Sequence, residues 1–170
     1  MTTPSTLPEP FGAGLTALLR GDLPADLYRL PPLPEDDGEP ALPTGVRHGA
    51  EETGWRVLPF RPPAGGSGGG TGEAGATDPE GPEGTKQLLL GEFAAAFDFP
   101  SGTGRNWDAL SDLLTDLSWL PPARGRLMVA PTWSGWRACD AGTVDTAEEI
   151  LREAVAYWSA RPVPFAALLG

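Results

Sequence analysis

The chain has 170 residues, 40% of them hydrophobic, which is enough for the core of one ordinary domain with appendages. Its formal charge of −11 repels nucleic acid and anionic membranes, so we expect a basic protein as partner. One cysteine, Cys139, excludes an internal disulfide, and one histidine, His48, leaves no His/Cys cluster for a metal. The sequence contains neither a signal-peptide pattern nor a run of about 18 apolar residues. We therefore expect a cytoplasmic protein that is monomeric when free and uses no cofactor.

Residues 1–54 are predicted to form a partly irregular N-terminal extension, because glycine and proline are concentrated in the first half of the chain. Within it, residues 13–20 have the pattern of a two-turn helix, and residues 27–30 that of a short strand. Residues 31–40 combine four prolines with four acidic residues, a composition that predicts an irregular, exposed loop.

A domain is expected over residues 55–170, opening with a strand over 55–60 in which Pro59 takes an end or edge position. Residues 61–84 are rich in glycine, proline and acids, the composition of a flexible insertion. A phosphate-binding loop is not indicated here, because no Gly-Lys-Ser/Thr sequence follows the glycines.

After the insertion, apolar residues recur with the spacing of helices and strands. Three strands alternating with helices predict an α/β fold, with a three-stranded parallel sheet flanked by helices. Asn106 is a good N-cap residue for a helix that continues to Pro121. The other predicted elements are a helix over 85–97, a strand over 126–131, a loop over 132–143, a helix that begins at the capping boxes of Asp145 and Thr146, and a strand over 165–169.

The helix that begins at Asn106 is amphipathic. At about 100° per residue, Asp108, Asp112 and Asp116 form a stripe on one side. Like charges at i and i+4 weaken a helix by a few tenths of a kcal/mol per pair, so the stripe is either solvated surface or a surface for a cationic partner. The pattern favours binding over catalysis. The apolar side holds Trp107, Leu110, Leu113, Leu114 and Leu117.

The sequence Phe99-Pro100, followed by Gly104-Arg-Asn-Trp-Asp-Ala-Leu-Ser-Asp-Leu-Leu, resembles the barstar family, the intracellular inhibitors of barnase-type secreted ribonucleases. The resemblance includes the glycine before the helix, the Asn-x-Asp-Ala-Leu start and a second aspartate four residues later. The order of elements from about Trp55 to Gly170 is also similar. The resemblance implies a barstar-like fold that carries an N-terminal extension and a Gly-rich insertion here.

In barstar-like proteins the acidic helix and the loop before it block the ribonuclease active site, where carboxylates take the place of RNA phosphates. The resemblance therefore implies Asp108 and Asp112 as principal anions, with Gly104 and Asn106 shaping the approach. A shorter match, Leu151-Arg-Glu-Ala154, implies Glu153 as an outlying contact. The implied partner is a basic secreted ribonuclease or RNase-type toxin, for which this chain would be the immunity protein. The candidate partner-binding residues are Gly104, Asn106, Asp108, Asp112, Asp116 and Glu153.

The sequence departs from the family pattern beside these residues. Gly102 and Thr103 occupy the loop positions where the family usually has an aromatic that packs into the nuclease site, so one interface anchor is missing. Ser111 stands between the two aspartates, where barstar itself has a tryptophan. Trp119 would lie at the angle between Asp108 and Asp112 if the helix continued that far, and would then supply an aromatic.

Other chemistries fit the sequence less well. Asp108 and Asp112 have a spacing that glycosidases use, but such a pair needs an enclosed cleft. With Asp116 they form a straight stripe, which cannot surround a divalent metal. Cys139 and His48 lack a third orienting group, and the tryptophans lack the interleaved Lys and Arg of single-strand binders. We therefore expect no enzyme.

Two binding functions remain. The first is an inhibitor that blocks a basic ribonuclease or RNase-type toxin through the acidic helix. The alternative is a non-inhibitory barstar-like module that binds another cationic protein. The first predicts that removing Asp112 abolishes nuclease binding, and the second predicts no nuclease binding at all.

Overall fold

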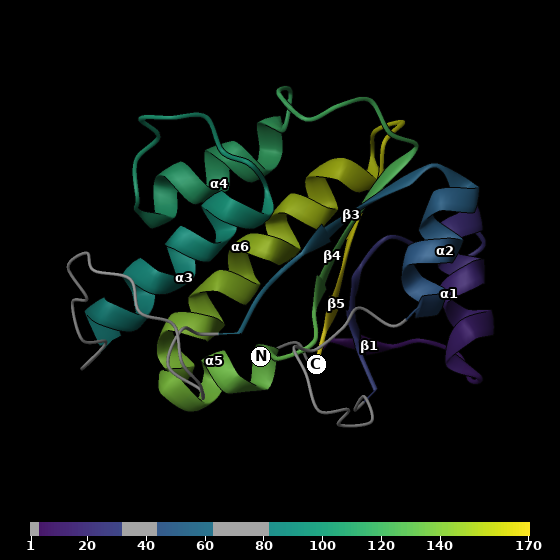
Figure 1. The fold of residues 1–170 in the computed structure, drawn as a ribbon, viewed down its shortest axis with the longest axis horizontal. Coiled ribbons are helices and arrows are strands. Elements are labelled where there is room, and N and C mark those ends of the chain that lie inside the picture. Colours follow the sequence, from purple (N-terminus) through teal and green to yellow (C-terminus); the bar gives the residue numbers. More distant parts are fainter. Residues whose placement is uncertain (1–3, 32–43, 63–81) are drawn as a thin grey trace.

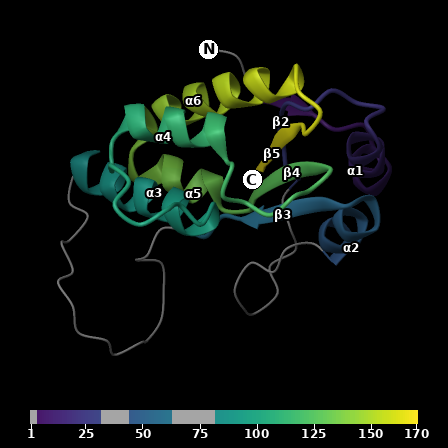
Figure 2. The same cartoon turned by 90° about the horizontal axis from the view of Figure 1, so that it is seen from above.

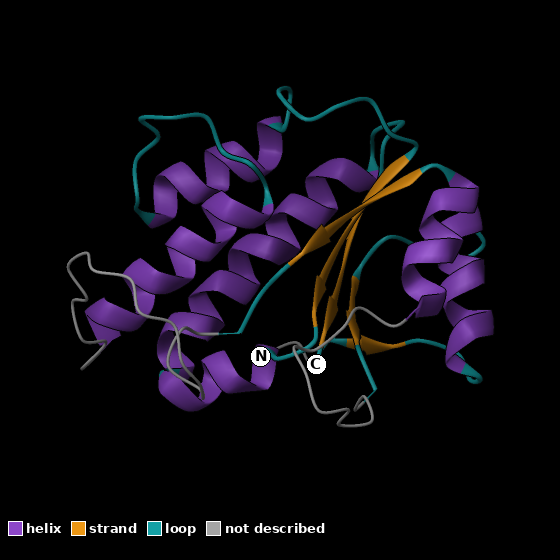
Figure 3. Ribbon diagram, viewed as in Figure 1, coloured by secondary structure: helices purple, strands orange, loops and turns teal. Residues whose placement is uncertain are grey.

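The computed structural model describes residues 4–31, 44–62 and 82–170. Figure 1 shows a sheet with helices against both of its faces, and Figure 3 distinguishes the helices and strands by colour. In chain order the elements are β1 (Ser5–Thr6), α1 (Phe11–Arg20), β2 (Leu27–Arg29), α2 (Thr44–Thr53), β3 (Trp55–Pro59), α3 (Pro82–Ala96), α4 (Trp107–Asp116), β4 (Gly125–Ala130), α5 (Trp133–Cys139), α6 (Ala141–Ser159) and β5 (Phe165–Leu169).

The sheet is parallel throughout, with the strand order β1-β2-β5-β4-β3. The predicted α/β class with a parallel sheet is confirmed, but the predicted number of three strands is wrong. Every residue of β4 and β5 is buried, as expected of parallel strands that are covered on both faces. A strand at the edge of a sheet leaves one row of backbone N–H and C=O groups unpaired. β5 is not an edge strand, because β2 pairs with the side of β5 that faces away from β4, and β1 pairs in turn with β2.

Helices α1 and α2 cover one face of the sheet, on the right in Figure 1. Leu15, Leu18 and Leu19 of α1 and Val46 and Ala50 of α2 are buried in this core. Residues of the predicted 1–54 extension thus supply two strands and a helical layer. The helix predicted over 13–20 and the strand predicted over 27–30 are present as α1 and β2. Helix α2 was not predicted. Its sequence is mostly polar, and the two apolar side chains that it buries, Val46 and Ala50, are too few to give a clear helical period.

Helices α3, α4, α5 and α6 lie on the opposite face, as Figure 2 shows from above. Their core is rich in aromatic side chains that meet edge to face. The ring centroids of Phe60 and Phe93 are 4.8 Å apart, and those of Phe93 and Trp133 are 6.4 Å apart. This core supports α4, whose outer face carries the predicted anions Asp108, Asp112 and Asp116.

Two sequence predictions in this layer are wrong. The loop expected over 132–143 contains α5, which buries Trp133 and Trp136. Helix α6 does not begin at Asp145 or Thr146 but at Ala141, because the carboxylate of Asp140 accepts a hydrogen bond from the Thr143 N–H at 3.0 Å. The earlier start also buries Val144 in the core.

Much of the remaining predicted irregular sequence lies outside the described residues. Only Pro31 of the loop predicted over 31–40 is described. Of the insertion predicted over 61–84, residues 63–81 lie outside, and α3 begins within the predicted insertion at Pro82. Within the described ranges, no helix is long and apolar enough to cross a membrane.

Candidate functional site

The start of α4 is fixed by a short loop and a side-chain cap. The loop after α3 turns through Gly102, whose φ of 87° lies in the left-handed region that glycine adopts readily. The Asn106 side chain then accepts a hydrogen bond from the Ala109 N–H at 2.8 Å. A Cβ at Gly104 would lie 3.2 Å from the Asn106 side-chain nitrogen and 3.4 Å from the Ala109 Cβ, so glycine suits this close approach. Asn106 therefore caps the helix, as the sequence predicts, and the absence of a side chain at Gly104 leaves room for this cap.

Asn106→Ala is expected to lower the free energy of unfolding by about 1 kcal/mol, because the Ala109 N–H loses its acceptor at the helix end. Urea denaturation measures this difference. Asn106→Asp is the matched control, since aspartate caps a helix equally well. Equal losses in both variants would show that the cap is not what Asn106 contributes.

The acidic stripe lies on the outer face of α4. Asp108, Asp112 and Asp116 are exposed, whereas Leu110 and Leu114 of the same helix are buried in the core. Among the described residues, none forms a salt bridge or side-chain hydrogen bond with these three carboxylates. The amphipathic prediction is therefore confirmed, and the stripe presents three negative charges to the surroundings.

Helix α4 ends earlier than predicted. It stops at Asp116, and Leu117 takes a left-handed conformation with φ of 48°. Two donors hold the carbonyls at this end: the Trp158 indole N–H bonds Leu114 O at 2.7 Å, and the buried Arg126 guanidinium bonds Leu117 O at 3.3 Å. These tertiary hydrogen bonds replace the continuation of the helix to Pro121, and they tie α4 to both α6 and β4.

Trp119 does not join the acidic face. Because α4 ends before it, its indole N–H instead bonds Phe97 O at 3.0 Å. Its ring packs edge to face against Phe99, with the centroids 5.7 Å apart. The condition under which Trp119 was expected to have an interface role, a helix that continues through this residue, is therefore not met.

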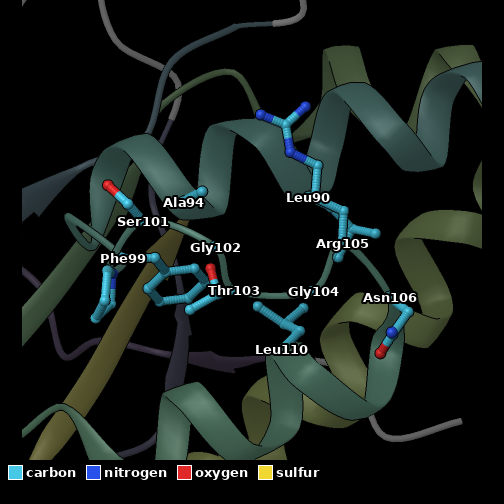
Figure 4. A pocket seen from close by; sticks show the side chains of 11 residues that line it. Leu90, Ala94, Phe99, Ser101, Gly102, Thr103, Gly104, Arg105, Asn106 and Leu110 are labelled. Carbon is cyan, nitrogen blue, oxygen red and sulfur yellow. The ribbon is translucent and has the colours of Figure 1, made fainter.

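A hollow of about 220 Å³ lies beside the start of α4, between α3 and the loop 99–106. Figure 4 shows the side chains around it. Small residues, Ser101, Gly102 and Thr103, form one wall of the hollow. Sequence reasoning missed this hollow, because its walls come from α3, the loop and α4 together. Its lining is Leu90, Ala94, Phe99, Pro100, Ser101, Gly102, Thr103, Gly104, Arg105, Asn106 and Leu110.

The arrangement argues against the catalytic alternatives. Neither Asp108 nor Asp112 lines this hollow, and both lie on an exposed helix face. No group of three His, Cys, Asp or Glu side chains within the described ranges is placed to hold a metal ion. Cys139 is on α5 and His48 on α2, which cover opposite faces of the sheet (Figure 1).

The comparison with protein families assigns the chain. The family model described as Barstar (barnase inhibitor) matches residues 84–170, which run from α3 to β5 and include the whole acidic helix. The protein belongs to the barstar family. No curated protein and no solved structure matches the chain. Within this barstar-family protein, β1, α1, β2, α2 and β3 all lie outside the matched range.

Glu153 lies on a different element from the other candidate residues of this barstar-family chain. It is exposed on α6, whose Trp158 is hydrogen-bonded to α4. The structure thus places five candidates on the loop and α4, and the sixth on the helix packed beside them (Figure 2). Tyr157, one turn beyond Glu153, is also exposed. Sequence reasoning missed it, although the apolar spacing of Leu151, Val155 and Trp158 leaves position 157 on the outer side.

Proposed function

We propose that this barstar-family protein binds a basic ribonuclease or RNase-type toxin and blocks its active site through the outer face of α4. The observation that carries the proposal is the exposed stripe of Asp108, Asp112 and Asp116, which no described side chain neutralises. A ribonuclease binds the phosphates of its substrate with cations, and a row of carboxylates can occupy the same positions.

The rigidity of α4 supports the proposal. Asn106 caps its first turn, and Trp158 and Arg126 bind the carbonyls at its last turn. A helix fixed at both ends holds the backbone that carries these carboxylates in place before a partner arrives, so binding does not have to order that backbone. We propose that this protein is an immunity protein that is monomeric when free. Its acidic face would block a secreted enzyme while that enzyme is still inside the cell.

Asp112→Ala is expected to weaken nuclease binding by at least about 2 kcal/mol, or about thirtyfold, because the partner's cations lose an acceptor in a desolvated contact. Titration calorimetry against a panel of barnase-type and other small basic microbial ribonucleases, at two salt concentrations, measures this loss. The folded state should not suffer, since removing Asp112 relieves repulsion with Asp108 and Asp116.

Glu51→Ala is the matched control, because it removes the same charge from α2 on the other face of the sheet. Its affinity should equal that of the wild type. A similar loss in both variants would mean that net charge, and not this face, attracts the partner.

A non-inhibitory interaction module is the second candidate function. It is favoured by the loop, where Gly102 and Thr103 provide a hollow and not a protruding aromatic. Absence of binding by the wild type across the whole panel would favour this alternative, and a search for another cationic partner would follow.

A further inference from the structure

Tyr157 is the large hydrophobic side chain that stands out from the described surface, with 38% of it exposed. Ala156 of α6 and Ala160, the residue that follows the helix end, are exposed and small, so they do not shield the ring. Within the described residues, the phenol oxygen has no hydrogen-bond partner. Hydrophobic residues are common on surfaces, but tyrosine is also one of the residue types, with tryptophan and arginine, that are enriched among the residues that dominate interface energies.

The ring of Tyr157 is held in place from two sides. The guanidinium carbon of Arg161 lies 3.3 Å from the ring centroid, and the Trp158 ring meets Tyr157 edge to face at 5.4 Å. Trp158 in turn donates its hydrogen bond to Leu114 O of α4. The position of Tyr157 is therefore tied to the helix that carries the acidic stripe, and little side-chain freedom remains to be lost on binding.

The outer side of α6 and the turn after it present three different chemistries side by side. Glu153 and Tyr157 lie about one turn apart on α6. Arg161 lies two residues beyond the helix end at Ser159 and places its guanidinium over the Tyr157 ring, so an anion, an aromatic ring and a cation follow one another. We call these three residues the α6 row. Helices α4 and α6 pack directly against each other, so a partner that covers α4 meets this neighbouring helix as well.

We propose that the α6 row is a second part of the partner interface and that Tyr157 is its aromatic anchor. This inference rests on the proposed binding of a partner at α4. The family's usual loop aromatic is absent at Gly102 and Thr103, and Trp119 is bonded inward to Phe97. Tyr157 supplies from the neighbouring helix the anchor that the loop lacks.

The α6 row also restricts the kind of partner. Cations of a basic protein pair with Glu153 and with the acidic stripe, but they are repelled by Arg161. The fitting partner therefore has a basic site bordered by a carboxylate or by free carbonyl oxygens that face Arg161. A surface that is basic throughout is disfavoured.

The test compares the dissociation kinetics of wild type, Tyr157→Ala and Asp112→Ala, using the ribonuclease of the panel that binds the wild type, at two salt concentrations. Tyr157→Ala is expected to dissociate at least about tenfold faster, with an unchanged salt dependence, because an apolar contact and no charge is lost. Asp112→Ala should bind more weakly and with a shallower salt dependence. Alanine is a strong helix former, and equal melting temperatures would show that α6 is intact.

Tyr157→Phe is the matched control. It keeps the ring against Arg161 and removes only the hydroxyl, so most of the affinity should remain. Wild-type kinetics for Tyr157→Ala, alongside loss of binding in Asp112→Ala, would overturn the α6 row and leave the proposed function standing. Failure of the wild type to bind any ribonuclease of the panel would overturn both.

Discussion

Glu148→Ala is expected to lower the free energy of unfolding by about 3 kcal/mol. The Glu148 side chain is only 8% exposed, and its two oxygens accept three hydrogen bonds. The donors are Trp133 Nε1 at 2.9 Å, Arg137 Nη2 at 2.6 Å and Arg152 Nη2 at 3.1 Å. Removing the carboxylate leaves the Trp133 indole N–H without this acceptor. It also removes the anion that the guanidinium groups of Arg137 and Arg152 share. Breaking a buried charge pair in this way costs about 3–5 kcal/mol, and we take the lower end because both arginines are partly exposed.

The same contacts favour the charged form of Arg137. Hydrogen bonds from Arg137 to Glu148, and then to Asp145, raise the pKa of Arg137 above its ordinary value. The stability that this arginine contributes is present below its unfolded pKa and is lost only when the pH rises through the folded one. No loss of this pairing is therefore expected on mild alkaline treatment.

Glu149→Ala is the control for Glu148→Ala, since it removes the next glutamate of the same helix from an exposed position. A surface change of this kind should stay within about 0.5 kcal/mol of the wild type. Urea denaturation of both variants measures the difference. If the two variants lost the same amount, helix content and not the buried network would be responsible.

The acidic helix was predictable from sequence because its signals are local. Asn106 precedes the first turn, and the alternation of leucine and aspartate has the helical period through Asp116. The end of the same helix was not predictable. It depends on the bonds from Trp158 and Arg126 to the carbonyls of Leu114 and Leu117, and these donors come from distant parts of the chain.

The strand count failed for a related reason. β1 has only two residues and carries no periodic pattern of its own, and the short strand predicted over 27–30, present as β2, was not predicted to join the sheet. Their place in the sheet is decided by pairing with β5, at the other end of the sequence, as in the register of Leu27 with Ala167. The start of α6 was predicted wrongly because three residues, Asp140, Asp145 and Thr146, can each cap a helix. A start at Asp140 also buries Val144, and the structure uses this cap.

The features of the candidate site also differ in whether they depend on local sequence or on contacts between elements. The stripe of Asp108, Asp112 and Asp116 follows from the spacing within one helix. By contrast, the direction of Trp119, the hollow beside Gly102 and the fixed ring of Tyr157 depend on contacts between elements. Sequence reasoning therefore found the charges of the proposed interface but not its aromatic component.

Gly125→Ala is expected to lower the free energy of unfolding by about 3 kcal/mol, at the upper end of the usual cost of overpacking. Gly125 is paired with Trp55 in the sheet register, and a Cβ at this position would lie 2.5 Å from two ring atoms of Trp55. The ring cannot easily move aside, because it is buried and its N–H bonds Leu19 O of α1 at 2.8 Å. Any shift that makes room also disturbs the contact between β3 and α1.

Gly91→Ala is the matched control, because a Cβ there meets no atom within 4 Å and the residue lies inside α3. It should stabilise the protein by about 0.5–1 kcal/mol, since alanine restricts the unfolded chain more than glycine does. Thermal unfolding of both variants measures these opposite effects, and wild-type stability in Gly125→Ala would show that the Trp55 ring moves freely.

Trp55 packs with α1 and α2, and the acidic face of α4 lies on the other side of the sheet. Gly125→Ala should therefore weaken the fold without changing partner affinity below its melting temperature, whereas Asp112→Ala should do the reverse.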